Sequence, residues 1–425
     1  MTFPNATTIA YFDPQSQAIQ LNEISFKAFL DAVAREDLVA LRENVGTIFH
    51  EVTHWADTVG TVWGQSYLSA VYRGLKLLER KDVPGAENDY HQFVTLHDLT
   101  RRIQLSDYYR VVHAGANPHD VNHRWIIQFS AGREFDTHGR IDNERPILFT
   151  RFLDHDSQEQ IIRQPMAIGA LLEINAVWSE IVSNREILSA MSADDRLIEE
   201  AIHRRERLST LYSEEMTIYT APVHMLAHYA RITDVTTAYE FASAVSHLVL
   251  NLSVTDFASL RLPPTMRAWA ALFPAFKRSA NRGFAFGVIC AHSRHWTLGT
   301  DVREWLDDAL ARAGLRPAHK IHQSAQCVME RRRATSGTGL LDEAERYLGE
   351  IGATVFRARS AGDTSYILRR SQDEDLPVPP LIDMNGDLLS IRPDLFDVER
   401  FPLEEIGRRA ASLHTWTMNL LSSCR

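Results

Sequence analysis

The sequence has few cysteines and no long apolar run. Its 425 residues include only Cys290, Cys327 and Cys424, an odd number at no metal-like spacing, which argues against a disulfide framework and against a cysteine zinc site. No apolar stretch approaches the roughly 20 residues that a helix needs to cross a bilayer, so no membrane partner is expected. The first residues show no basic segment followed by an apolar one, so no secretory signal is expected. These absences predict a reduced, cytoplasmic protein.

Basic residues are fewer than acidic ones, with 45 Lys and Arg against 55 Asp and Glu. The formal net charge is −10, which argues against a nucleic-acid partner because such binding needs a concentrated positive field. The short basic run at residues 331–333 is interpreted as a solvated helix end. The composition, 45% hydrophobic and 24% charged, is that of an ordinary globular protein. At this length we expect one large domain with insertions or two domains.

One short stretch carries a recognisable pattern, the H-E-x-x-H at residues 50–54. It falls within a predicted helix from about Glu36 to Gly60, whose apolar residues form one stripe at helical spacing: Ile48, Val52, Trp55, Ala56 and Val59. At 100° per residue, His50, His54 and Asp57 lie within about 60° of one another on the opposite side. This face predicts a metal site. The alternative is a pair of packed, hydrogen-bonded core histidines.

Two histidines one helical turn apart can direct ring nitrogens at one Zn²⁺ ion. A third protein ligand leaves one coordination position for water, which ionises near pH 7 when bound. Glu51, between the histidines, is then placed to act as general base in the attack of that water on a carbonyl. Asp57 is interpreted either as a hydrogen-bond acceptor for a ligand histidine or as an ordinary polar residue.

A second predicted helix, around residues 167–182, carries Glu173 beside small residues. Glu173 shares a face with Gly169, Ala170, Ala176 and Glu180, so this helix can approach another closely. A carboxylate on such a face requires a cation, a set of hydrogen bonds or a metal. Glu173 is therefore the candidate third ligand; an arginine partner or exposure to solvent are the alternatives.

A second histidine pair, His224 and His228, also has helical spacing but no internal glutamate. Such a pair is more often exposed to solvent or hydrogen-bonded than catalytic. Together with the nearby Tyr219, these histidines are candidates for stabilising a transition-state oxyanion.

The residues His50-Glu51-Val52-Thr53-His54, followed by Glu173 within a later helix, resemble the zinc metallopeptidases and specifically the gluzincins. The metzincin continuation is absent. The resemblance implies Zn²⁺ bound by His50, His54 and Glu173, Glu51 as general base, and a protein or peptide substrate. It also implies a donor to the oxyanion, for which Tyr219 and His224, then His228, are the candidates. The separation of 119 positions between His54 and Glu173 requires an insertion or lid.

The expected fold class is α+β and predominantly α-helical. A small N-terminal β-hairpin from residues 8–21 packs on the active-site helix. Residues 1–235 form the expected metallopeptidase domain, with a long helical insertion at about 61–165. Residues 236–425 are expected to be mainly helical, with a short hairpin near 354–368 and a last helix from about 403 to 421.

The leading hypothesis is a zinc-dependent intracellular endopeptidase, with residues 236–425 shaping substrate access or binding a regulatory protein partner. A second hypothesis is a regulatory or binding protein whose zinc site is structural or vestigial. A third is a metal-dependent hydrolase acting on a non-peptide amide or ester.

Overall fold

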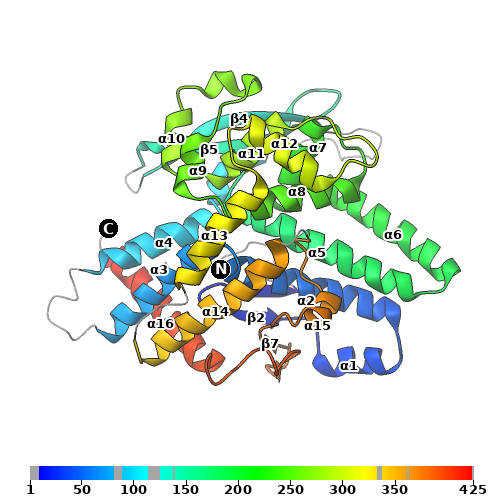
Figure 1. The fold of residues 1–425 in the computed structure, drawn as a ribbon, viewed down its shortest axis with the longest axis vertical. Helices are drawn as coiled ribbons and strands as arrows, with labels where there is room; N and C mark the ends of the chain where they lie inside the picture. Colours follow the sequence, from blue (N-terminus) through cyan, green and yellow to red (C-terminus); the bar gives the residue numbers. More distant parts are fainter. Residues whose placement is uncertain are drawn as a thin grey trace. The chain divides into compact units, whose positions relative to one another are not determined.

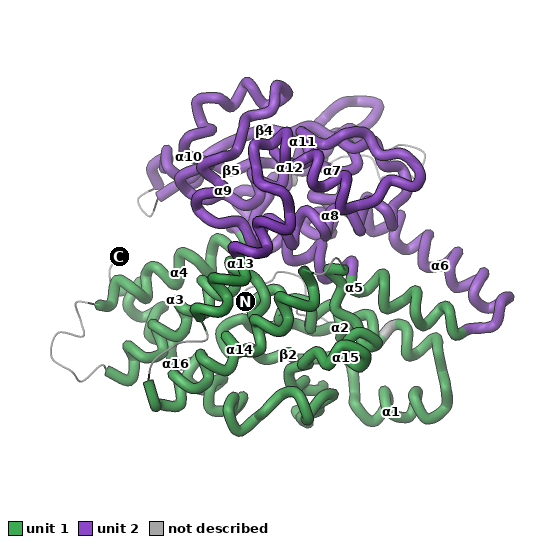
Figure 2. Tube along the Cα trace, viewed as in Figure 1, with its two compact units in different colours: residues 1–104, 179–190, 325–425 green, residues 105–178, 191–324 purple. Residues whose placement is uncertain are grey.

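The computed structural model of the chain describes residues 9–80, 89–112, 125–136, 139–332, 337–360 and 363–423. They form an α+β, mostly helical protein, as predicted. Two compact units interleave along the sequence: unit 1 comprises residues 1–104, 179–190 and 325–425, and unit 2 residues 105–178 and 191–324 (Figure 2). The boundary expected near residue 235 falls inside unit 2, so it does not coincide with a division between the units.

The sheet of unit 1 joins segments from both ends of the chain. Strands β1 (Ala10–Asp13) and β2 (Ala18–Leu21) form the predicted antiparallel hairpin. Strand β2 then pairs in parallel with β7 (Leu381–Ile382), which pairs antiparallel with β8 (Leu388–Leu389). The hairpin packs on helix α2 (Leu38–Val59), as expected for the helix that carries the H-E-x-x-H pattern.

Helices make up most of unit 1 (Figure 1). Besides α2 they are α1 (Phe26–Ala34), α3 (Val62–Glu79), α4 (His91–Ile103), α14 (Leu340–Ser360), α15 (Leu368–Asp373) and α16 (Leu403–Ser423). Helix α16 confirms the predicted last helix. Helices α5 (Ile168–Ala190) and α13 (Ala318–Arg332) contribute only their C-terminal parts to unit 1.

Helix α14 crosses the end of α2 at unusually short range. A Cβ added to Gly352 would lie 2.1 Å from the carbonyl oxygen of Val59, and one added to Gly60 would lie 2.6 Å from Val355 Cγ1. Only glycine at these two positions allows the backbones to come this close. The crossing brings the C-terminal turn of α14 to the buried end of α2.

The predicted hairpin near residues 354–368 is wrong. The first half of that stretch is the last part of α14, and the second leads into α15. Thr354, Val355 and Phe356 suggested a strand because β-branched and aromatic residues favour strands. However, buried residues at helical spacing along α14, including Leu341, Leu348 and Val355, continue through this segment. Packing of a 21-residue helix therefore overrides the local preference.

The expected helical insertion at about 61–165 is only partly correct, because its second half is a sheet. After α3 and α4, strands β3 (Val111–Val112), β4 (Ile126–Phe135), β5 (Ile141–Leu153) and β6 (Gln160–Pro165) form an antiparallel sheet in the order β3-β6-β5-β4. Residues 147–149 and 152–153 of β5 are buried, whereas much of β4 is only partly so. The alternation that identifies strands from sequence is therefore weak in β4.

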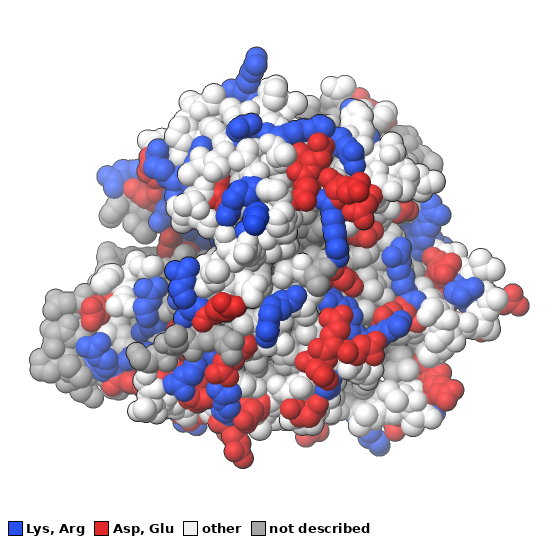
Figure 3. Space-filling model, viewed as in Figure 1, with Lys and Arg blue, Asp and Glu red and all other residues white. Residues whose placement is uncertain are grey.

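The remaining elements of unit 2 are helical. They include α6 (Ala193–Leu211), α7 (Thr217–Ala230), α8 (Val235–Leu250), α9 (Val254–Ser259), α10 (Phe273–Arg278), α11 (Arg282–His292) and α12 (Val302–Arg312), with short turns η2 (Asp107–Tyr109) and η3 (Pro264–Trp269). Among the described residues, no helix combines the length and the apolar character that a membrane span requires. On the face seen in Figure 3, basic and acidic side chains are interspersed.

Candidate metal centre

Helix α2 presents both histidines of the pattern. Asp37 caps its first turn by accepting a hydrogen bond from the backbone N–H of Ala40, and Gly60 ends it. The predicted apolar stripe is buried, with Val52, Trp55 and Ala56 fully inaccessible to solvent. This anchored stripe fixes the rotation of the helix about its axis and thus the direction of the opposite face.

The three polar residues of the pattern form a compact cluster within unit 1. Ligand atoms of His50, Glu51 and His54 all lie within 4.8 Å of one another. The two imidazole rings are 4.9 Å apart between centroids and stand almost perpendicular, at 83°. Two imidazoles and a carboxylate are donors that suit Zn²⁺ and other divalent transition metals. The described residues therefore fit a metal ion by the chemistry of their donors.

Burial differs between the members of this cluster. His54 is inaccessible to solvent and Glu51 is 3% exposed, whereas the side chain of His50 is 12% exposed. A site in such surroundings has a lower effective dielectric than water, so its charges interact more strongly. Of the three, His50 provides the most solvent-accessible side of the cluster.

Glu180, on α5, lies beside His50. Its Oε2 is 3.6 Å from His50 Nδ1, an ion-pair distance rather than a hydrogen bond. Gly46 permits this approach, because a Cβ there would lie 3.1 Å from Glu180 Cγ and 3.4 Å from Asn184 Oδ1. A carboxylate next to one ring nitrogen favours the tautomer that leaves the other nitrogen available to a metal. The sequence placed Glu180 on the Glu173 face but gave no sign of its contact with His50.

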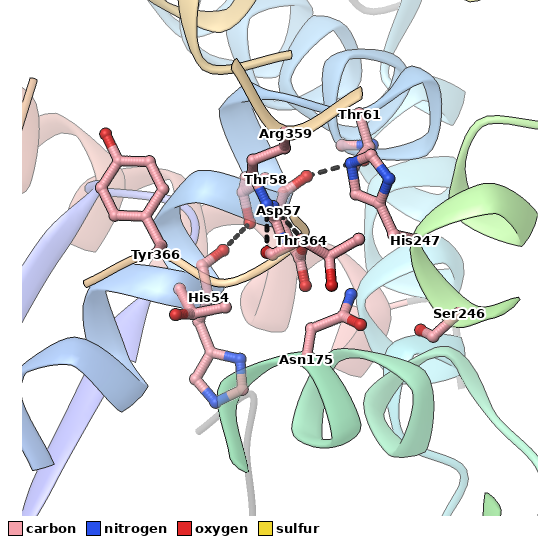
Figure 4. A network of polar contacts seen from close by, with 12 residues as sticks. His54, Asp57, Thr58, Thr61, Asn175, Ser246, His247, Arg359, Thr364 and Tyr366 are labelled. Atoms are coloured by element: carbon pink, nitrogen blue, oxygen red, sulfur yellow. Dashed lines mark hydrogen bonds and ion pairs between the residues drawn. The ribbon is translucent and has the colours of Figure 1, made fainter. Parts of the chain in front are cut away.

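Asp57 pairs with an arginine that is distant in the sequence. Its Oδ1 accepts a 2.6 Å hydrogen bond from Arg359 Nη1, across 302 positions, and both side chains are inaccessible to solvent (Figure 4). Arg359 Nε donates to the carbonyl oxygen of Thr364 at 2.8 Å. Asp57 is thus part of a buried ion pair. Its predicted hydrogen bond to a ligand histidine stays a prediction.

Threonine hydroxyls in α2 and just after its end hydrogen-bond to α2 carbonyls one turn earlier in this buried region. The hydroxyl of Thr58 donates to the carbonyl of His54 at 2.9 Å, and that of Thr61 to the carbonyl of Asp57 at 2.6 Å. Hydroxyls buried without such acceptors would destabilise the fold. The helix around His54 is therefore internally hydrogen-bonded as well as packed.

Glu173, the predicted third ligand, lies on α5 and is inaccessible to solvent. It belongs to unit 2, whereas the histidine pair belongs to unit 1, and its place in the ligand set stays a prediction. Its part of α5 is held by α8: Ser243 donates to Asn175 Oδ1 at 3.0 Å, and Ser246 donates to the carbonyl of Leu171 at 2.7 Å.

Tyr219, His224 and His228 all lie on α7 in unit 2. The His224 ring nitrogen Nε2 is 2.7 Å from the carbonyl oxygen of Leu211, and the ring packs near three aromatic side chains, Trp125, Phe152 and Tyr212. This matches the hydrogen-bonded alternative given for this histidine pair. Tyr219 is buried, at 7% exposure. Their role at an oxyanion stays a prediction.

His228 contacts Phe129 and Tyr229. Partial burial, and then the nearby Arg231, lower its pKa below the ordinary value of 6.5. It is therefore mostly neutral at pH 7.

No protein-family model, curated protein or solved structure matches the chain. Function is therefore inferred from the His50, Glu51 and His54 cluster and from the chemistry of its donors.

Proposed function

We propose that this protein is a zinc-dependent endopeptidase that hydrolyses a protein or peptide substrate. The observation that carries the proposal is the buried cluster of His50, Glu51 and His54, with ligand atoms within 4.8 Å of one another. His50 and His54 would hold Zn²⁺, and Glu173 is the proposed third protein ligand. When bound, Zn²⁺ supplies a Lewis acid that lowers the pKa of water to about 7.

The residues of the chain have distinct roles in the proposed reaction. The Glu51 carboxylate accepts a proton from the attacking water as the water oxygen bonds to the substrate carbonyl carbon. The same carboxyl then gives the proton to the departing amine nitrogen as the peptide C–N bond breaks. General-base help of this kind contributes about 10²–10⁴-fold to the rate.

Two further residues position this machinery. Glu180, 3.6 Å from His50, orients the imidazole of His50 and favours the tautomer whose other ring nitrogen can bind a metal. Arg359 anchors the end of α2 through Asp57, so that the helix cannot rotate without exposing a charge to an apolar interior.

Glu173 is proposed as the third ligand on the geometry of α5. It lies seven residues, about 10 Å or two turns, before Glu180 on one continuous helix, so the two carboxylates share a face. Glu173 is also fully buried, and a metal is one of the partners that a buried carboxylate requires. Glu173→Ala should lower zinc occupancy, and full occupancy would reassign the third ligand.

The deciding experiment compares Glu51→Gln with the unaltered protein. Purified wild-type protein should contain about one zinc per chain and should create new N-termini in a mixture of denatured proteins. Glu51→Gln keeps both imidazole ligands and the side-chain size, so it should retain zinc and lose about 10²–10⁴-fold in rate. Unchanged hydrolysis by Glu51→Gln would refute the mechanism. Hydrolysis confined to small amides or esters would point to the non-peptide hydrolase instead.

A regulatory or binding protein with a structural zinc site is the second candidate. The complete burial of His54 and the 3% exposure of Glu51 favour it, because structural sites are closed to water. It predicts bound zinc, no hydrolysis by the wild-type protein, and the same loss of stability on zinc removal in wild type and Glu51→Gln.

We also propose a reducing, cytoplasmic location. Among the described residues, Cys290 and Cys327 are free thiols, and exposed Cys327 would be open to oxidation elsewhere. A regulatory partner of residues 236–425 is likewise a proposal, and co-purification of partners with the intact chain would identify one.

A further inference from the structure

The first three turns of helix α6 expose three large apolar side chains to solvent. Leu197, Ile198 and Ile202 are 67%, 59% and 41% exposed. The helices of a globular protein normally bury such a stripe. Three large apolar side chains exposed on adjacent turns mark a surface that a partner covers.

The less exposed side of α6 is polar. Arg196, Glu199, His203 and Arg207 recur there at helical spacing, and all four are only partly exposed. The usual distribution of polar and apolar residues is thus reversed in the first three turns of this helix, whereas near its end Leu208 is partly exposed and Leu211 is buried. Burial within the chain does not account for these three exposed apolar residues, which points to an interaction with a partner.

The charges of α6 are arranged to suit an antiparallel copy of the same helix. Asp194 and Asp195 occupy the first turn, and Arg204 and Arg205 lie in the second half. At 100° per residue, Asp194 and Arg205 lie near the centre of the exposed face, with Ile198 close beside them. The face is therefore acidic at one end, apolar in the middle and basic at the other end.

A two-fold axis passing between residues 199 and 200 makes this face self-complementary. In that antiparallel register, Asp194 meets the partner's Arg205, and Ile198 lies beside the partner's Ile202 on the same side of the axis. Each contact occurs twice, as in any isologous interface. A parallel arrangement would instead place acid against acid and base against base, which is unfavourable.

We propose that α6 is the dimerisation helix of this protein and that its partner is the α6 of a second copy. The helix has 19 residues, about 28 Å, so one helix pair forms an interface at the small end of the specific range. The dimer should therefore dissociate on dilution through the micromolar range, about 1–100 µM. The proposal is independent of the zinc chemistry of α2.

The test is a charge swap measured on the full chain by sedimentation velocity or light scattering. With rising concentration, the wild-type mass should increase from 48.3 kDa toward twice that value. Asp194→Arg and Arg205→Asp should each raise the dissociation constant about tenfold or more. The double variant, which restores opposite charges across the axis, should recover most of the lost affinity.

Three results would overturn the proposal. The first is a wild-type protein that stays monomeric at every concentration up to about 100 µM. The second is a dimer whose dissociation constant neither single charge reversal changes. The third is a double variant that dimerises no more tightly than the single variants. Arg205→Asp lies away from the first turn, so it gives a valid result even where Asp194→Arg unfolds the helix end.

A matched pair of apolar substitutions completes the test. Ile198→Glu places a charge in the middle of the proposed interface and should give a monomer. Leu298→Glu is the control, because Leu298 is 92% exposed and lies in a turn outside α6, and it should leave the dimer unchanged. Circular dichroism of each variant verifies folding, and equal loss of dimer in both would refute the role of α6.

Discussion

Helices α2 and α7 each carry two histidines four residues apart, yet their surroundings differ completely. On α2, His50 and His54 lie with Glu51 in one cluster, and Glu180 adjoins His50. On α7, the Nε2 of His224 is occupied by a backbone carbonyl, and His228 lies against aromatic rings. The spacing puts two rings on one face of a helix, but the neighbouring carboxylates decide whether that face suits a metal.

Removing one histidine from each pair is the strongest test of whether the α2 pair, and not the α7 pair, binds a metal. His54→Ala should reduce zinc from about one per chain to nearly none and abolish hydrolysis, because a single imidazole holds the metal poorly. His228→Ala, the matched control, should retain zinc. Metal analysis of the two purified variants decides the matter, and equal zinc in both would refute the α2 site.

The buried ion pair at the end of α2 gives the next largest effect. Arg359→Met leaves the Asp57 carboxylate buried without its guanidinium, so the free energy of unfolding should fall by about 3–5 kcal/mol. Arg357→Met, on the exposed side of the same helix, should change it by less than about 0.5 kcal/mol. Urea unfolding of both variants measures the difference, and similar midpoints would show that the pair contributes little.

Glu180 adjoins His50 of the α2 pair, so replacing it tests how much a neighbouring carboxylate contributes to zinc binding. Glu180→Gln removes the charge beside His50 while keeping the side-chain shape, so zinc affinity should fall about 10–100-fold. Glu186→Gln, further along α5, is the control and should bind zinc like the wild type. Competition with a chromogenic chelator gives both affinities; an unaffected Glu180→Gln variant would exclude a positioning role.

The smallest expected effect concerns pH and the α7 pair. Because the folded-state pKa of His228 is below 6.5, the unfolded chain binds this proton more readily. The corresponding stability is present above pH 6.5 and is lost as the pH falls below that value. His228→Gln should make the decline of the thermal midpoint between about pH 6.5 and 5 shallower. An identical decline in both proteins would contradict this assignment.

Local patterns predicted the elements that local sequence determines. The apolar stripe of α2 and the N-terminal hairpin depend on residues close together in the chain, and both were found as predicted. The interpretation of residues 354–368 failed because the decisive packing of α14 at Gly352 involves α2, almost 300 positions earlier. The antiparallel sheet of unit 2 was missed for a related reason, since the sequence does not reveal which strands pair.

The same distinction holds for the candidate site. His50, Glu51 and His54 were accessible to sequence reasoning because they lie within one turn of one helix. Arg359 and the contact of Glu180 with His50 were not, because both depend on helices brought together by the fold. Arg359 lies near the end of α14. Its burial, which would have suggested a partner, becomes visible only in three dimensions.

The pairing of Asp57 with Arg359 also determines the order in which parts of the chain can fold during synthesis. The two residues are 302 positions apart, and at about 5–20 residues per second the ribosome takes roughly 15–60 s to make the intervening chain. Throughout that interval Asp57 lacks Arg359 as its partner, and unit 2 can be made in full before unit 1 is complete. Early metal capture by His50 and His54 would therefore occur on a nascent chain that still lacks α14, and the finished site would be secured only as the last quarter of the protein folds.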